Sequence, residues 1–436
     1  MIANRKSIET PMLKNWQHTN FDAYAIWCNV SNVKKDTDTM YTIFNKTKKN
    51  IFDKTIINAH KENDITIVSG IHLDAMHSNT RNISGWVNST EKIQFLKTIF
   101  NGQLRKIYIL FNGLIYNKKD LEIEIQLKNN ISCVSPFDIL INYYLEFGFD
   151  KLIKCIYGIY SLIIIDITDK TTIYIGNDTY CIKPLFFWGT FEPDNIDFSF
   201  ANYSPAGIAT QILNPNTYLK ISIDRKIFDM EYYNVSNYIK DISTNSQENI
   251  LIILNKIVTN NLYENKLYSC SCVNSVFFVN FFQSQIKNFT NVTISNTEEN
   301  IINYNTLKNV TNLTYTNNII QPIIDQIKQT FGTNFLSPKL NDNIKIIKYY
   351  LLFKYIKEAT KIDVLFVDTY YDIFECSDIE QTMFMIQTTP LIPPFISRIA
   401  EHFKIKIIEI LLYNDLFRYI VSQPLSVKQE IRKILF

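Results

Sequence analysis

Glycine is scarce in this chain of 436 residues, where it occurs only 10 times. A chain of this length with average composition would hold roughly 30 glycines. Glycine has no Cβ atom and therefore lets the backbone approach a phosphate group closely. The scarcity leaves few places where a glycine-rich nucleotide loop could form.

An excess of one charge and a long apolar run are also missing. The 44 basic and 42 acidic residues give a net charge of +2, so we expect neither a nucleic-acid partner nor a membrane-surface partner. The longest apolar window, residues 152–167, is too short to span a bilayer and contains Lys154. We expect it to form a buried strand and its lead-in.

The seven cysteines are scattered and odd in number, and the first residues lack the apolar core of a signal peptide. Both observations favour a reducing compartment, and we predict a cytoplasmic protein. The abundance of Asn, Ile, Lys and Tyr is typical of an AT-rich genome, including that of a virus, in which case the virion is the second location to consider.

The length exceeds what one hydrophobic core usually supports, so two domains are expected. In the first half, short runs rich in Ile, Val and Tyr predict strands, and a hairpin over residues 159–176. Two more strands are expected around the Asp224-Arg225 turn. The predicted strands before these are residues 64–71, 107–111 and 159–166.

The segment after Tyr116 is ambiguous on its residues alone. Glu122 and Glu124 alternate with Ile123 and Ile125, which favours a strand, whereas Asn117 could cap a helix.

The second half has a different pattern. Residues 234–249 are polar and irregular, as in a linker. Beyond them, helical stretches alternate with short strands, and a helix over residues 343–360 precedes the strand at 362–367. This order indicates a parallel sheet.

Three segments resemble motifs of the asparagine synthetase family in their order and spacing. "FNGLIYNKKDL" (111–121) is similar to its Asn-Gly-Glu-Ile-Tyr-Asn, and "IYGIYSLIIID" (156–166) to its Asn-Gly-x-Phe-Ala-Phe strand. "NDTYCIKPLFF" (177–187) is similar to its Arg-Asp-x-x-Gly-x-Lys-Pro-Leu hairpin. The resemblance extends to residues 405–435, which look like the family's closing Glu-x-Arg-x-Pro-Phe-x-Asp helix and Lys-x-x-Arg end.

The resemblance implies an α/β protein with two domains. Residues 1–21 would be an N-terminal extension and residues 22–235 a class II glutamine amidotransferase-like domain, an Ntn-type α/β/β/α sandwich. Residues 236–249 would link it to an ATP-pyrophosphatase-like (adenine nucleotide α-hydrolase-like) domain with a parallel sheet, residues 250–436. The resemblance also implies that the ambiguous segment around Glu122 is a helix.

Glutaminases of this family use an N-terminal cysteine whose own α-amine helps to move the proton. Here the chain starts Met1-Ile2-Ala3, the family's first strand falls near Asp22, and the nearest thiol is Cys28. We expect Cys28 to be a buried strand cysteine.

The glutamine pocket is altered as well. Asn112 and Gly113 match the family's oxyanion-forming pair, but Leu114 replaces the carboxylate that would hold the substrate's amino group. Pro136 replaces the Asp of the family's Ser-Asp-x-Glu stretch. We therefore interpret Asn112 and Gly113 as a vestigial pocket and, like Asp178, Lys183 and Pro184, as residues that keep the sandwich folded.

In the second domain, the family's Ser-Gly-Gly-x-Asp-Ser loop falls on residues 270–275. Ser271 and Cys272 replace both glycines, Asn274 replaces the carboxylate, and Ser275 is unchanged. Side chains would then stand where phosphate oxygens must approach. A metal site or a redox pair at Cys270 and Cys272 is the alternative, but the histidines (His18, His60, His72, His77, His402) show no matching spacing.

The second nucleotide motif falls on residues 367–374, where its glycines are lost and Tyr371 replaces a carboxylate. Asp368 and Asp372 could hold a cation or serve as partners of a helix dipole.

Two functions follow from these replacements. The first is a catalytically degenerate asparagine-synthetase-like protein without a cofactor, which binds protein partners or assembles with itself. The second is an ATP-dependent synthetase that uses free ammonia, needs Mg-ATP and lacks glutaminase activity. The tyrosines at positions 349, 350, 355, 370 and 371 could line an interface or pack in the core.

Overall fold

The structure is a computed structural model of the chain. The described residues are 23–31, 54–62, 65–73, 94–100, 103–129, 133, 136–168, 170–192, 195–202, 210–215, 217–224, 227–234, 250–262, 267–271, 276–287, 289–296, 310–315, 317–331, 340–367, 371–378, 381–382 and 392–435. The predicted N-terminal extension and the linker at 236–249 lie outside them.

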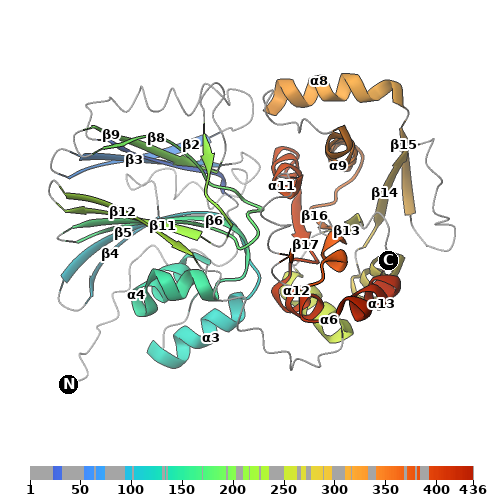
Figure 1. The fold of residues 1–436 in the computed structure, drawn as a ribbon, viewed down its shortest axis with the longest axis horizontal. Helices are drawn as coiled ribbons and strands as arrows, with labels where there is room; N and C mark the ends of the chain where they lie inside the picture. Colours follow the sequence, from blue (N-terminus) through green and yellow to red (C-terminus); the bar gives the residue numbers. More distant parts are fainter. Residues whose placement is uncertain are drawn as a thin grey trace.

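The N-terminal half contains two six-stranded antiparallel sheets stacked face to face (Figure 1). The first has the order β10-β8-β9-β1-β3-β2 and the second the order β12-β11-β7-β6-β5-β4. The strands are β1 (Ala23–Ser31), β2 (Lys54–Glu62), β3 (Ile65–Leu73), β4 (Gln94–Phe100), β5 (Gln103–Ile115), β6 (Gly158–Ile167), β7 (Thr171–Asn177), β8 (Phe186–Glu192), β9 (Asn195–Ala201), β10 (Gln211–Ile212), β11 (Thr217–Asp224) and β12 (Ile227–Asn234).

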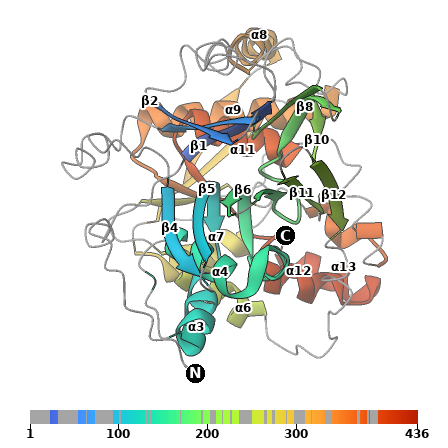
Figure 2. The same cartoon turned by 90° about the vertical axis from the view of Figure 1, so that its left-hand side faces the viewer.

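Two helices, α3 (Lys118–Asn129) and α4 (Pro136–Cys155), cover the outer face of the second sheet, as Figure 2 shows from another side. These layers agree with three of the four expected for an α/β/β/α sandwich. The described residues place no helix on the outer face of the first sheet.

The predicted strands at 64–71, 107–111 and 159–166, the 159–176 hairpin and the strands around Asp224 are all present. The prediction of a strand at residues 117–130, made from the alternation alone, is wrong, because the segment forms the helix α3. The helix α3 buries Leu121 and Ile125, which lie one turn apart, and leaves Ile123 and Leu127 exposed. Asn117 does not cap this helix, because its side chain bonds the Cys155 carbonyl and the Tyr157 amide instead.

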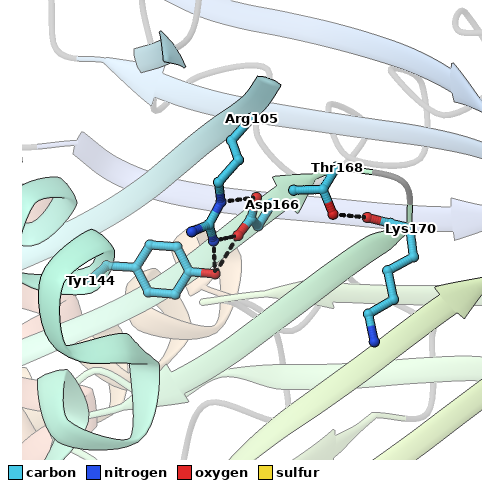
Figure 3. A network of polar contacts seen from close by, with 5 residues as sticks. All are labelled: Arg105, Tyr144, Asp166, Thr168 and Lys170. Carbon is cyan, nitrogen blue, oxygen red and sulfur yellow. Dashed lines mark hydrogen bonds and ion pairs between the residues drawn. The ribbon is translucent and has the colours of Figure 1, made fainter. Parts of the chain in front are cut away.

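A polar network ties α4 to the second sheet on its helix-covered face (Figure 3). Arg105 of β5 forms an ion pair with Asp166 of β6, and the Tyr144 hydroxyl of α4 donates to the same carboxylate at 2.6 Å. Each member is at least partly buried, and the opposite charges offset each other. Thr168 and Lys170 close the β6–β7 turn nearby, through the Thr168 hydroxyl and the Lys170 carbonyl.

The C-terminal half is built on a parallel sheet. The strands β13 (Tyr268–Ser271), β16 (Val364–Val367) and β17 (Lys406–Glu409) pair in that order. The pair β14 (Asn291–Asn296) and β15 (Val310–Tyr315) joins the β13 side through a bridge between Tyr268 and Phe289. The spatial order is therefore β15-β14-β13-β16-β17, which confirms the expectation of a parallel sheet.

Helices pack on both faces of this sheet. One face is covered by α6 (Ile250–Asn261), α7 (Val276–Gln285), α12 (Asn414–Val421) and α13 (Leu425–Leu435). The other is covered by α8 (Ile320–Phe331), α9 (Leu340–Ala359) and α11 (Ile392–His402). Two short 3₁₀ helices, η4 (Asn317–Ile319) and η6 (Tyr371–Glu375), complete the elements.

Two expectations for this half can be compared with the structure. The segment that resembles the family's closing helix and Lys-x-x-Arg end includes strand β17 and the helices α12 and α13. Of the two alternatives for the tyrosines, core packing holds for those described. Tyr349 and Tyr350 are buried in the core under α9, and Tyr355 packs against the same cluster. The side chains of Tyr370 and Tyr371 lie outside the described residues.

Candidate functional site

A polar row crosses three neighbouring strands at one end of the second sheet. Asn112 of β5 is paired with Ser161 of β6, which is paired with Asn177 of β7. Alternate residues of these strands, Leu110 and Ile163, belong to the core between the two sheets, so the row points into the same space. Its members are only 2%, 0% and 3% exposed, respectively.

Ser161 and Asn177 of this row donate hydrogen bonds to groups inside the protein. The Ser161 hydroxyl donates to the Lys183 carbonyl at 2.8 Å. Asn177 donates through Nδ2 to the Leu213 carbonyl and to Cys181 Sγ, both at 3.1 Å. These polar groups therefore support the surrounding loops, whereas an open substrate pocket would leave some of them to solvent.

Gly113 is required where β5 and β6 approach each other. Its φ is +145°, and a Cβ atom there would lie 2.0 Å from the carbonyl oxygen of Ile159. The contact explains why glycine occupies this position without any reference to catalysis.

Asp178 organises the loop that follows β7. Its buried carboxylate accepts hydrogen bonds from four backbone amides. Oδ1 accepts from the amides of Tyr180 at 3.1 Å and Ile182 at 3.0 Å. Oδ2 accepts from the amides of Lys183 at 2.9 Å and Tyr160 at 3.3 Å. Burial raises the pKa of Asp178 to about 6, although the four amides oppose this shift. The arrangement is that of a loop anchor.

Cys181 stands where the family's hairpin motif has glycine. Its φ is +54°, a left-handed conformation that glycine adopts freely and other residues adopt at a cost. The thiol is buried, and burial raises its pKa well above the usual value. An inert, strained cysteine therefore replaces the flexible glycine.

Cys28 lies in the middle of β1, between Ser69 of β3 and Phe200 of β9. It is 0% exposed, and burial raises its pKa to about 12. A thiol in this position is protonated at neutral pH and cannot reach a substrate.

A second candidate region lies at the carboxyl ends of the parallel strands. The register aligns Ser271 of β13, Val367 of β16 and Glu409 of β17 in one row. The chain continues from β13 to β14 on one side of the sheet and from β16 to β17 on the other side. The boundary between β13 and β16 is therefore a topological switch point, and ligands of such sheets bind there, beside the carboxyl ends of the strands.

The predicted loop residues fall beside this switch point, but the structure describes few of their side chains. Asn274, Ser275 and Asp368 lie outside the described residues, as does Cys272. Asp372 belongs to the backbone of η6, and nothing further is described of it. Upstream, Tyr268 and Cys270 are buried in the cluster under α6 and α7. Among the described residues, no three His, Cys, Asp or Glu side chains come together as a metal site.

Two basic residues of α13 hold the end of η6, and no sequence pattern predicts either of them. Lys428 is fully buried and donates to the Cys376 carbonyl at 3.0 Å. Arg432, one turn later, forms an ion pair with Glu375 at 2.7 Å. Burial lowers the pKa of Lys428 below its usual value.

The two halves meet at a contact that we call the junction, formed by Tyr116, Tyr157 and Tyr180 with Tyr413, Phe417 and Arg418. Its rings pack closely: Tyr116 stacks on Tyr413 at 5.1 Å, and Tyr180 meets Phe417 edge-on at 4.8 Å. Arg418 lies over Tyr157 at 5.6 Å. Because Tyr116, Tyr180, Tyr413 and Phe417 belong to one buried cluster, the halves share a continuous core.

The sequence matches the family described as "Glutamine amidotransferase domain" over residues 99–244. It is also similar to asparagine synthetase [glutamine-hydrolyzing] of Rattus norvegicus and Mus musculus. Each is 28% identical over 116 residues, which cover 24% of this chain and 20% of the relative. The chain is similar to asparagine synthetases in this region.

Another similar protein is the asparagine synthetase of Cricetulus griseus, which is 29% identical over 82 residues. That match covers 18% of this chain and 14% of the hamster enzyme. The matched family region of this asparagine synthetase-like chain includes the row of Asn112, Ser161 and Asn177, and it ends before the parallel sheet begins. Every helix among the described residues is too short or too polar to cross a membrane.

Proposed function

We propose that this protein is a catalytically degenerate asparagine-synthetase-like protein that acts as a scaffold for protein partners or for its own assembly. The observation that carries the proposal is the position of Cys28, which is enclosed in β1 and has a pKa of about 12. Cys28 is the thiol nearest to the position that the family resemblance gives to the nucleophile.

The polar row supports the same conclusion. Asn112 and Gly113 match an oxyanion-forming pair, but Asn112 is buried and Gly113 is required by the close approach of Ile159. Losing one oxyanion donor typically raises a barrier by about 3 kcal/mol, and here the nearest thiol, Cys28, is buried as well.

Assays on the purified full-length chain test this proposal. We expect no glutamate release from glutamine, no pyrophosphate release from ATP and no change in thermal stability with Mg-ATP. A ligand present at about 100 times its Kd would add about 2.7 kcal/mol of stability. Glutamate or pyrophosphate released in proportion to protein concentration would refute the proposal.

A second candidate is an ATP-dependent synthetase that uses free ammonia. Its support is the order of the parallel strands, which retains a switch point between β13 and β16. In that case Mg-ATP raises the melting temperature, and aspartate, ammonium and ATP yield an amide, AMP and pyrophosphate. Glutamine does not replace ammonium in this reaction.

The partner-binding role needs its own experiment. We propose a cytoplasmic or virion-associated protein that binds neither nucleic acid nor membrane. Purification from the native source with identification of the proteins that accompany it tests the partner, and the mass of the pure protein in solution tests self-assembly. A monomer that carries no companion would contradict the scaffold role.

A further inference from the structure

The helix α3 is apolar on two opposite faces. Leu121 and Ile125 are 2% and 0% exposed and belong to the core between the helices and the second sheet. Ile123 and Leu127 are 56% and 84% exposed, and at 3.6 residues per turn they lie on the opposite side of the helix. A surface helix of a monomeric protein usually has one apolar face, so the outer face of α3 has the composition of a contact surface.

Charged residues flank this outer face along one side. Asp120 in the first turn, Glu124 and Lys128 in the last turn follow one another at the helical spacing. Asp120 is exposed, and the Lys128 side chain is 60% exposed although it lies 4.0 Å from Glu146. Glu124 is already engaged in an ion pair with Lys151. This side of the helix therefore offers a negative charge at its start and a positive charge at its end.

A second copy of α3 complements both the apolar stripe and these charges. In two α3 helices packed antiparallel about a two-fold axis near Ile125, Ile123 of each copy faces Leu127 of the other. Residues on the same side of the two helices then approach from opposite ends, and Asp120 of one copy lies about 3 Å along the helix axis from Lys128 of the other. This attraction forms twice, because the interface is symmetric. A parallel pair would bring like charges together.

We propose that two copies of this protein form a two-fold dimer through the outer faces of their α3 helices. The inference rests on the self-assembly side of the proposed function and assigns a surface to it. The helix has 12 residues and offers a strip about 18 Å long and about 10 Å wide. This strip is smaller than the roughly 800 Å² per partner of a standard interface. The dimer is therefore weak and depends on protein concentration.

The variant Leu127→Glu tests the apolar contact. Its side chain is 84% exposed, so the change should leave the folded monomer as stable as before. Sedimentation velocity of the full chain at increasing concentration should show the dimer. The variant should raise its dissociation constant about tenfold or more, because the dimer would bury an unpaired carboxylate.

Leu425→Glu is the matched control. Leu425 is also exposed, but it begins α13 in the C-terminal half, away from α3 in both views (Figures 1 and 2). This variant should leave the dissociation constant of the dimer unchanged.

A pair of charge variants tests the two-fold arrangement. Asp120→Lys and Lys128→Glu, each alone, place like charges opposite each other twice and should weaken the dimer about threefold to tenfold. Mixed in equal amounts, the two variants should associate with each other as strongly as the original protein, because both contacts then join opposite charges again. Asp120→Lys also removes an attraction to Lys256 of α6, an effect within one chain that mixing does not repair.

The inference is overturned by a monomer at every concentration, by a dimer that Leu127→Glu leaves intact, or by a mixture as weak as the single variants. A dimer that survives Leu127→Glu places self-assembly at another surface, so the proposed function stands. A monomer whose companion protein is lost in Leu127→Glu assigns the surface to a different partner. The proposed function fails separately, when the pure chain releases glutamate or pyrophosphate.

Discussion

Replacing Phe417 with alanine should destabilise both halves of the protein together. Phe417 is 1% exposed, and its ring meets Tyr180 across the junction at 4.8 Å. Truncating a buried Phe to Ala usually costs about 3–5 kcal/mol, and Phe417 belongs to the cluster shared by the two halves. We therefore expect Phe417→Ala to lower the free energy of unfolding by about 3–5 kcal/mol.

The distribution of tryptophan makes the assay selective. All four tryptophans precede residue 235, at positions 16, 27, 86 and 188. Their fluorescence therefore reports on the N-terminal half, whereas circular dichroism at 222 nm reports mainly on the helices, most of which lie in the C-terminal half. In urea, both signals should shift to the same lower midpoint. The reasoning is refuted if the fluorescence midpoint stays unchanged while the helical signal shifts.

A double-mutant cycle locates the coupling. Tyr180→Leu and Phe417→Leu should be non-additive by about 0.5–1.5 kcal/mol, the usual energy of an aromatic pair. Phe353 is the matched control, because it is equally buried but packs within the C-terminal half. Tyr180→Leu and Phe353→Leu should be additive within about 0.5 kcal/mol.

Three further variants test local features by urea unfolding. Gly113→Ala should lower the free energy of unfolding by about 2–4 kcal/mol, because its Cβ would lie 2.0 Å from a carbonyl oxygen of β6. Gly148 also has a positive φ but faces open space, so Gly148→Ala should cost only about 1 kcal/mol. Equal losses would contradict the steric argument. The pKa of Asp178 is raised to about 6 in the folded state, so its contribution to stability is fully present below about pH 4 and is lost as the pH rises through 6. Asp178→Asn should abolish this part of the pH dependence of stability. A variant with an unchanged profile would show that another group is responsible. Burial lowers the pKa of Lys428, so the unfolded chain binds more protons and stability should rise with pH toward 10.5. At pH 7, the free energy of unfolding of Lys428→Met should be within about 1 kcal/mol of that of the original protein. A loss above about 2 kcal/mol would show that the ammonium stabilises the fold.

The sequence was most informative where burial has a simple period. Continuous apolar strands such as β6, and the alternation of helix and strand in the second half, predicted the antiparallel and parallel sheets. The helix α3 was misread on its residues alone, because Ile123 and Leu127 are exposed and create an alternation that does not reflect burial. The family resemblance corrected this error, since it carries information on tertiary context.

The candidate sites were only partly predictable. Asn112 and Gly113 were identified from their motif, and the replacement of glycine by Cys181 is visible in the same way. The junction was not predictable, because Tyr116 and Tyr413 are separated by 297 residues and meet only in the folded chain. Lys428 is fully buried near the end of η6, and neither its neighbours in the sequence nor its charge indicates this position.

The position of Tyr116 beside β17 also matters for any attempt to divide the protein. A chain that begins after residue 235 would lose Tyr116 and Tyr180, whose rings pack on Tyr413 and Phe417, and would expose these two rings to solvent. Exposed apolar patches of this kind favour aggregation. Such a fragment should form insoluble aggregates, and the two halves should be recovered in soluble form only when they are produced together.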